Sequence, residues 1–207
     1  MDKKPFLWLD WISEASALVQ AGLTYTENEF DTERYNRLRA MLAELTAEVV
    51  HHPAKEIESL FSFEKGYPTP KLDVRAFVLR NNQLLLARER ADNCWSLPGG
   101  WVDINHSPAE SAIKETLEET GFQVQVVKLL AVWDKQKHDH PPQWPHIHKY
   151  FFHCEILSGM PKPNIEISEI DFFPIDKLPP LSTPRVTEKQ ILRLYELIPH
   201  DIPTAFD

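Results

Sequence analysis

Three glutamates at helical spacing are the residues of this sequence best placed to do chemistry. Glu115, Glu118 and Glu119 stand at positions i, i+3 and i+4, so an α-helix brings their carboxylates onto one face. Like charges held that close repel each other unless a cation lies among them. Mg²⁺ prefers such oxygen ligands and usually shares them with substrate phosphates. The spacing indicates a metal-dependent enzyme acting on phosphate compounds; the alternative is a solvated, acidic surface helix.

The flanking residues predict the helix that positions these glutamates. Ser107 is a good N-cap, Pro108 suits the first helical position, and Glu110 completes a capping box. Gly121 favours the left-handed conformation that ends a helix. The helix is therefore expected to present its carboxylates on one side and to pack by the other, which carries Ala109, Ile113, Thr116, Leu117 and Thr120.

The stretch from Gly100 to Phe122 resembles the Nudix box, G-x5-E-x7-R-E-U-x-E-E-x-G-U, where U is a bulky aliphatic residue. Both glycines, the three glutamates and Phe122 fall in register, whereas His106, Lys114 and Thr116 replace the first Glu, the Arg and the aliphatic residue. Lys114 lacks the planar fork of arginine, so we expect it to hold its loop less rigidly. The resemblance implies a catalytic metal site for Mg²⁺ or Mn²⁺, made by Glu115, Glu118, Glu119 and the backbone carbonyl of Gly100.

The chain is expected to divide near residue 66. The preceding part predicts three helices: about 6–21, ending near Gly22; a second capped by Asp31 and ending near 51; and a third opened by Pro53. One apolar stripe per helix makes a thin core. We therefore predict a helical N-terminal domain, residues 1–66, that packs on the rest of the chain or on a second subunit. The stripe of the second helix comprises Tyr35, Leu38, Leu42, Leu45 and Val49.

The remainder alternates strands and helices. Apolar and β-branched runs predict strands over 73–80, 83–88, 123–133, 149–156 and 169–173, with a closing helix over 187–197. With the resemblance, this pattern implies an α+β protein in which residues 67–207 form a Nudix α/β/α sandwich with a mixed sheet.

A long connection between the third and fourth of these strands, residues 134–148, combines cations, imidazoles, prolines and a tryptophan. Long loops in compact domains are often functional. Trp144 could stack on a base, and Lys135, Lys137 or the histidines could bind phosphate; a solvated loop is the alternative. The pairs His138/His140 and His146/His148 would suit zinc, but no cysteine or further acidic ligand shares a recognisable spacing.

Other candidates lie on the predicted strands. Arg75 and Arg88 are expected to contact a diphosphate, because a guanidinium can grip two oxygens; ordinary surface charge is the alternative. A box glutamate, Glu166 or Glu169 is a possible general base.

Two further segments narrow the resemblance. Residues 67–75 and 137–142, together with a helical N-terminal domain, resemble a bacterial Nudix subgroup of homodimers described as ADP-ribose or CDP-choline pyrophosphatases. In that subgroup the first box Glu is commonly replaced, as by His106 here. The resemblance implies a Mg²⁺-dependent hydrolase of a nucleoside diphosphate linked to a group X. The alternatives are a non-catalytic nucleotide sensor and an RNA 5′-end pyrophosphohydrolase.

Composition limits the partners. The net charge of −9 disfavours broad binding to nucleic acid or anionic membranes. Cys94 and Cys154 form no recognisable motif, and no signal peptide or membrane span is evident. We therefore expect a cytoplasmic enzyme.

Overall fold

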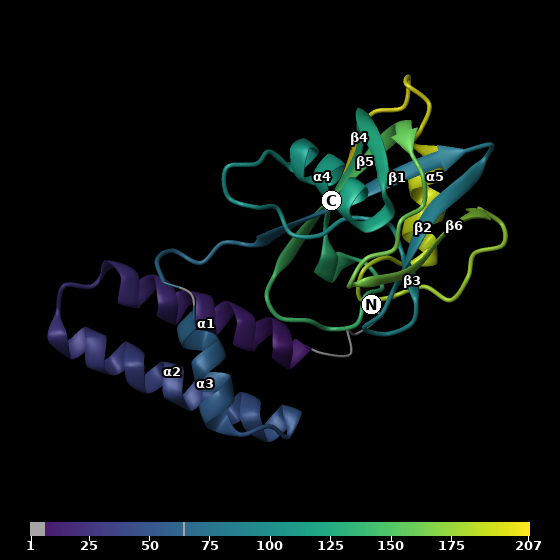
Figure 1. Ribbon diagram of the computed structural model, residues 1–207. Helices are drawn as coiled ribbons and strands as arrows, with labels where there is room; N and C mark the ends of the chain where they lie inside the picture. The colour runs from purple at the N-terminus through teal and green to yellow at the C-terminus, as the bar shows by residue number, and fades with distance from the viewer. Residues whose placement is uncertain (1–6, 64) are drawn as a thin grey trace. The chain divides into compact units, whose positions relative to one another are not determined.

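The computed structural model describes residues 7–63 and 65–207, and the chain divides into two compact units (Figure 1). The first unit ends at Pro70, and the second runs from Lys71 to Asp207. The predicted boundary at residue 66 lies in the segment just before this division. Each unit is described by itself.

The first unit is helical, as predicted: α1 (Leu7–Tyr25), α2 (Glu29–Val50) and α3 (Ala54–Phe63). The predicted end of the first helix at Gly22 was wrong, because α1 continues through it. A Cβ at Gly22 would lie 2.3 Å from the ring of Tyr35, so this glycine allows α1 and α2 to approach closely. The cap of α2 is Asn28 and not Asp31, since the Asn28 side chain accepts hydrogen bonds from the N–H groups of Phe30 and Asp31.

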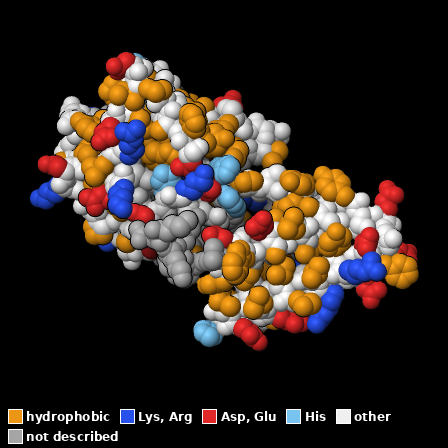
Figure 2. Space-filling view, turned by 180° about the vertical axis from the view of Figure 1, so that it is seen from behind, with side chains coloured by type: hydrophobic (Ala, Val, Ile, Leu, Met, Phe, Trp, Pro, Cys, Tyr) orange, Lys and Arg blue, Asp and Glu red, His pale blue; other side chains and the backbone are white. Residues whose placement is uncertain are grey.

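Large apolar side chains of the first unit stand outside its core. The buried residues of α2 are Ala43, Thr46 and Ala47, and the small core cluster joins Ala43 and Ala47 to Ile57. Figure 2 shows hydrophobic side chains spread over the visible face of these helices. Three of the exposed residues belong to the predicted stripe of the second helix: Leu38, Leu45 and Val49. Trp11, Leu18 and Met41 are also exposed.

The second unit is built on a mixed sheet, with the strand order β3-β2-β1-β5-β4-β7 and β6 paired with β2. The pairs β1–β5 and β4–β7 are parallel, and the others are antiparallel. All five predicted strands are present, whereas two-residue β3 and β7 escaped prediction. The strands are β1 (Lys71–Arg80), β2 (Gln83–Glu89), β3 (Trp95–Ser96), β4 (Phe122–Asp134), β5 (Ile147–Gly159), β6 (Ile167–Pro174) and β7 (Ala205–Phe206).

Two helices cover opposite faces of this sheet, α4 (Pro108–Thr120) and α5 (Glu188–Glu196) (Figure 1). Because side chains alternate along a strand, β1 sends Val74, Ala76 and Val78 to the cluster around Ala112 of α4, and Phe77 to the cluster that includes Ile191 and Leu194 of α5. Each face of the sheet therefore has its own hydrophobic core, one under α4 and one under α5. The predicted α/β/α sandwich with a mixed sheet, preceded by helices, is confirmed.

Within the described parts of the chain, no helix is long and apolar enough to cross a membrane.

Candidate active site

A cavity of about 740 Å³ opens in the second unit. Its walls come from β1, β2, α4, the start of β5, the loop before α4 and the loops around residues 164–166 and 184–185. The cavity brings together several predicted site residues: Arg75, Gly100, Glu115, Glu118, Glu119 and Glu166.

The helix that carries the three glutamates forms as the sequence predicts. The Ser107 hydroxyl accepts a hydrogen bond from the Glu110 N–H at 3.2 Å, and the Glu110 carboxylate accepts one from the Ser107 N–H at 2.8 Å. Gly121 ends α4 with φ 77°. The buried Thr116, which replaces an aliphatic residue of the box, donates its hydroxyl to the Ala112 carbonyl. This substitution is therefore accommodated without an unpaired polar group.

The three glutamates differ in burial. Glu119 is only 7% exposed and accepts a hydrogen bond from the Gly99 N–H at 2.8 Å; its burial raises the pKa of the carboxyl group to about 8. Burial also raises the pKa of Glu115, whereas the side chain of Glu118 is 55% exposed. The Lys114 ammonium lies 3.6 Å from Glu118 and 2.8 Å from Asp103. Lys114 therefore links α4 to the preceding loop through a single ion pair with Asp103.

Two adjacent glycines let this loop approach β1 and α4. Gly99 has φ +140°, and a Cβ there would lie 2.0 Å from the Val74 carbonyl oxygen. A Cβ at Gly100 would lie 3.2 Å from a Glu115 oxygen. The Gly100 carbonyl accepts a hydrogen bond from the Val74 N–H at 2.8 Å and keeps a second lone pair.

A buried charge network lies on β1 and β5. Arg75 donates to both Asp73 carboxylate oxygens, at 3.0 and 2.7 Å, and to the Leu97 carbonyl at 3.1 Å. Lys149 also donates to Asp73. Burial alone would raise the pKa of Asp73, but the charges of Arg75 and Lys149, with their hydrogen bonds, lower it to about 2. Burial lowers the pKa of Lys149 to about 8.

Further charged residues complete the lining. Lys135 is buried and contacts Gln143, and burial lowers its pKa to about 8. Arg185 lies 2.9 Å from the buried Glu89, which also accepts a hydrogen bond from Ser96. Cations and carboxylates thus share one cavity.

The loop that carries Glu166 is fastened to α4. Asn164 donates from its side-chain nitrogen to the Glu118 carbonyl at 3.0 Å, and its side-chain oxygen accepts from the N–H groups of Glu166 and Ile167. The Glu166 carbonyl accepts from the Arg90 N–H. Glu166 is therefore held near the C-terminal half of α4, which carries the three glutamates and is called the acid helix below.

Four predicted site residues are not among those that line the cavity. Arg88 pairs with Glu169 at 2.6 Å, directly across from it on β6. Lys137 is exposed and Trp144 is partly exposed, both in the long connection after β4. Their roles stay predictions.

Several residues that line the cavity are not recognisable as site residues from the sequence. Asp73 and Lys149 each begin a predicted strand, and the sequence pattern indicates no site role for either. Lys135, one of the loop cations that the sequence offers for phosphate binding, does line the cavity. Trp101 brings an aromatic ring to the cavity. Its position next to Gly100 is the feature of the sequence that could have indicated this role.

The residues of the acid helix fit a hard divalent cation. Three carboxylates and a backbone carbonyl are all oxygen donors. Gly100 is close enough to Glu115 that a side chain at this position would crowd the carboxylate. Burial raises the pKa of both Glu115 and Glu119, so their charged forms are unfavourable unless a cation lies beside them. A cation would relieve this charge.

Comparison with known proteins agrees with this geometry. Residues 69–195 match the NUDIX domain family, and residues 7–61 match a family described as the UDP-X-like, N-terminal oligomerisation domain. The chain therefore belongs to the Nudix hydrolases, enzymes that generally use divalent metals. Within that family it combines the catalytic domain with this oligomerisation domain.

Individual relatives extend over most of the chain. YjhB of Bacillus subtilis, a proposed ADP-ribose pyrophosphatase, is 44% identical over 201 residues, covering 97% of each chain. The crystal structure of a UDP-X diphosphatase is similar over 96% of this chain and 97% of its own, with 34% identity and a TM-score of 0.65. An ADP-ribose pyrophosphatase from Streptococcus suis is 38% identical, covers 67% of this chain and 100% of its own, and has a TM-score of 0.61.

Proposed function

We propose that this chain is a Mg²⁺-dependent pyrophosphatase that hydrolyses the diphosphate bridge of a nucleoside diphosphate linked to a group X. ADP-ribose and CDP-choline are the leading substrates. The observation that supports the proposal is the mixed lining of one cavity, where the box carboxylates accompany Arg75, Lys135 and Lys149. A diphosphate carries negative charge that suits both the cations and a metal held by the carboxylates. The names of the relatives support the same class of substrate.

Glu115, Glu118 and Glu119, with the Gly100 carbonyl, would hold the metal. When bound, the ion neutralises phosphate oxygens and acidifies a water molecule. Mn²⁺ suits the same oxygen ligands.

The chain's own residues orient and surround the diphosphate. Asp73 fixes the Arg75 guanidinium by two hydrogen bonds, so this cation is preorganised and loses little side-chain freedom on binding. Lys135 and Lys149 add positive charge in a place largely removed from water, where electrostatic attraction is stronger. Trp101 offers a ring face for the base.

Glu166 is our candidate for the general base, because it lines the cavity on a loop fastened to α4. In the proposed reaction the oxygen of a water molecule bonds to one phosphorus, the bridging P–O bond breaks, and the water's proton passes to the base. The products are two phosphate monoesters.

We further propose that the chain works as a homodimer in the cytoplasm. The exposed apolar side chains of α1 and α2, together with the match to an oligomerisation domain, support the dimer. Cys94 and Cys154 are free thiols, which suits a reducing compartment.

The test is chromatographic product analysis with Mg²⁺ and a panel containing ADP-ribose, CDP-choline, a UDP-sugar and a 5′-triphosphorylated RNA. We expect AMP with ribose 5-phosphate, or CMP with phosphocholine. Glu118→Gln should lower turnover at least about 100-fold, since loss of a ligand should cost no less than loss of a residue that merely orients one. Glu188→Gln, an exposed substitution on α5, is the matched control. Binding of a nucleotide without cleavage would favour the sensor, and wild-type turnover by Glu118→Gln would refute the site.

A further inference from the structure

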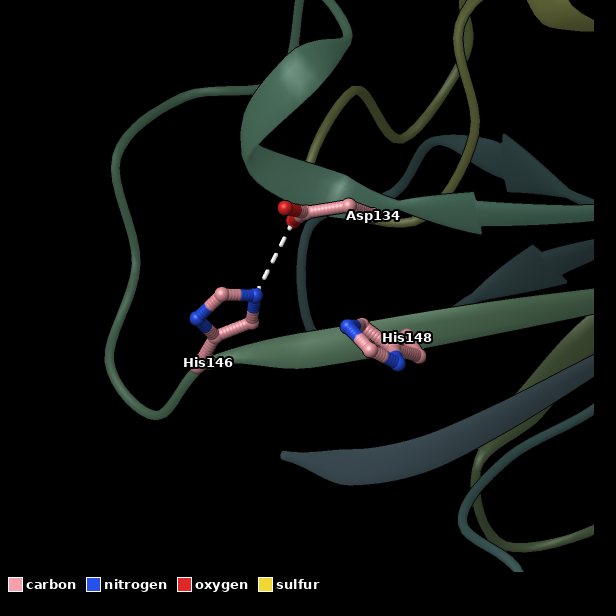
Figure 3. Close-up of side chains that lie close together, drawn as sticks. All are labelled: Asp134, His146 and His148. Atoms are coloured by element: carbon pink, nitrogen blue, oxygen red, sulfur yellow. Dashed lines mark hydrogen bonds and ion pairs between the residues drawn. The ribbon is translucent and has the colours of Figure 1, made fainter. Parts of the chain in front are cut away.

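A second group of potential metal ligands lies at the end of the β4–β5 pair. Asp134 is the last residue of β4, His146 precedes β5, and His148 is the second residue of β5. One ligand atom from each lies within 4.8 Å of the others (Figure 3). Among the residues that the structure describes, this is the one set of three His, Cys, Asp or Glu side chains gathered so closely.

The strand pairing explains why these residues meet. Asp134 and His148 are direct partners in the antiparallel register of β4 and β5, so their side chains project from the same face of the sheet. His146 is two residues before His148, a spacing that returns to the same face of an extended chain. The intervening Ile147 and the following Lys149 line the cavity instead. The three ligands therefore lie on the other face of β5.

The side chains already interact and remain accessible. His146 Nε2 lies 3.1 Å from an Asp134 carboxylate oxygen, drawn as the dashed line in Figure 3. The same oxygen accepts a hydrogen bond from the Gln136 N–H at 2.9 Å, which fixes the carboxylate. The rings of His146 and His148 have centroids 5.4 Å apart. All three side chains are partly buried, so solvent can reach them.

The donor set selects a class of metal. Two imidazoles and one carboxylate suit divalent first-row transition metals, zinc above all, whereas Mg²⁺ prefers oxygen ligands only. This set has one carboxylate and two imidazoles, whereas the set on α4 has three carboxylates. The two other loop histidines are engaged elsewhere: His138 with Asp207, and His140 with the Thr183 carbonyl.

We propose that Asp134, His146 and His148 bind a divalent transition metal ion such as Zn²⁺, at a site separate from the carboxylates of the acid helix. The ion fastens together the two ends of the loop formed by residues 135–145. This loop supplies Lys135 and Gln143 to the cavity wall. Zinc binding thereby braces the wall of the active site without using any of its residues.

The first experiment is isothermal titration of the metal-free, full-length protein with zinc alone. It is done in the Glu118→Gln background, so that zinc does not take the carboxylate site, and no substrate is needed. We expect one zinc ion per chain with a dissociation constant in the micromolar range or tighter. His146→Ala and His148→Ala should each weaken binding at least tenfold, and His200→Ala, which removes an exposed histidine elsewhere, should not. Circular dichroism checks that each variant is folded.

Two results would overturn the site: no saturable binding up to about 100 μM zinc, or binding that is unchanged in both histidine variants. In the first case the His146–Asp134 contact is an ordinary hydrogen bond. The bracing is tested by hydrogen exchange, which should slow in residues 135–145 when zinc is added to the Glu118→Gln protein. Unchanged exchange in this loop, with zinc bound, would refute the bracing.

Discussion

Replacing Asp73 by Asn removes the negative partner of two buried cations. Arg75 then keeps its bond to Leu97, but both of its bonds to a charged acceptor are lost, and Lys149 loses the same acceptor. Breaking a buried ion pair on one side typically costs about 3–5 kcal/mol. Glu119 and Glu89 also attract Arg75. We therefore expect the lower end of this range, a loss of about 3 kcal/mol in the free energy of unfolding.

The pH dependence gives a second estimate. The pKa of Asp73 falls from 3.8 to about 2 in the folded protein, which corresponds to about 2–3 kcal/mol. Because the folded pKa is the lower one, this contribution is fully present above about pH 4. It is lost as the pH falls through 2. The variant should lack this acid-dependent loss.

Urea unfolding followed by tryptophan fluorescence measures the effect, since Trp95 and Trp133 are buried in the second unit. Glu196→Gln is the matched control. Glu196 pairs with Arg193 at 2.7 Å, but both side chains are exposed, so the change should stay below about 0.5 kcal/mol. A loss below about 1 kcal/mol for Asp73→Asn would refute the view that this carboxylate stabilises the network.

Three further changes probe other parts of the molecule. Gly99→Ala should lower the free energy of unfolding by more than about 3 kcal/mol, because its Cβ would lie 2.0 Å from the Val74 carbonyl oxygen. Turnover should fall as well. A melting temperature within error of the wild type would contradict this prediction. Burial lowers the pKa of His140 to about 4, below its unfolded value, so the folded protein should lose about 2–3 kcal/mol as the pH falls from about 6.5 to 4. His140→Asn, which retains a donor for Thr183, should show a flatter urea-stability profile over that range, and an equal slope would count against it. Leu38→Glu with Leu45→Glu should yield monomers in analytical ultracentrifugation while the second unit stays folded; an intact dimer would place the interface elsewhere.

The acid helix could be predicted because its determinants are local. Ser107, Glu110 and Gly121 act within one turn of the helix ends, and the structure confirms each of them. The five strands were equally readable from apolar runs. The same local reading failed at Gly22, where the reason for a glycine is the ring of Tyr35 on another helix.

The rest of the site depends on pairings that no local pattern reveals. Asp73 and Lys149 meet because β1 and β5 run parallel, with the two residues in register. In the loop, the sequence offers Lys135 and Lys137 alike for phosphate binding, yet of these two lysines Lys135 lines the cavity. The zinc hypothesis lacked an acidic ligand for a similar reason, because Asp134 joins the histidines across a strand pair.

The hydrogen bond from Asn164 to the Glu118 carbonyl has a mechanical consequence. It joins the end of the acid helix to the loop of Glu166, together with the backbone hydrogen bond from the Lys162 N–H to the Thr120 carbonyl. Any opening that releases products would then carry the proposed base and the proposed metal ligands together, or break these hydrogen bonds. In the proposed reaction, a constant spacing between the two groups would decide which phosphorus of a bound diphosphate the water attacks.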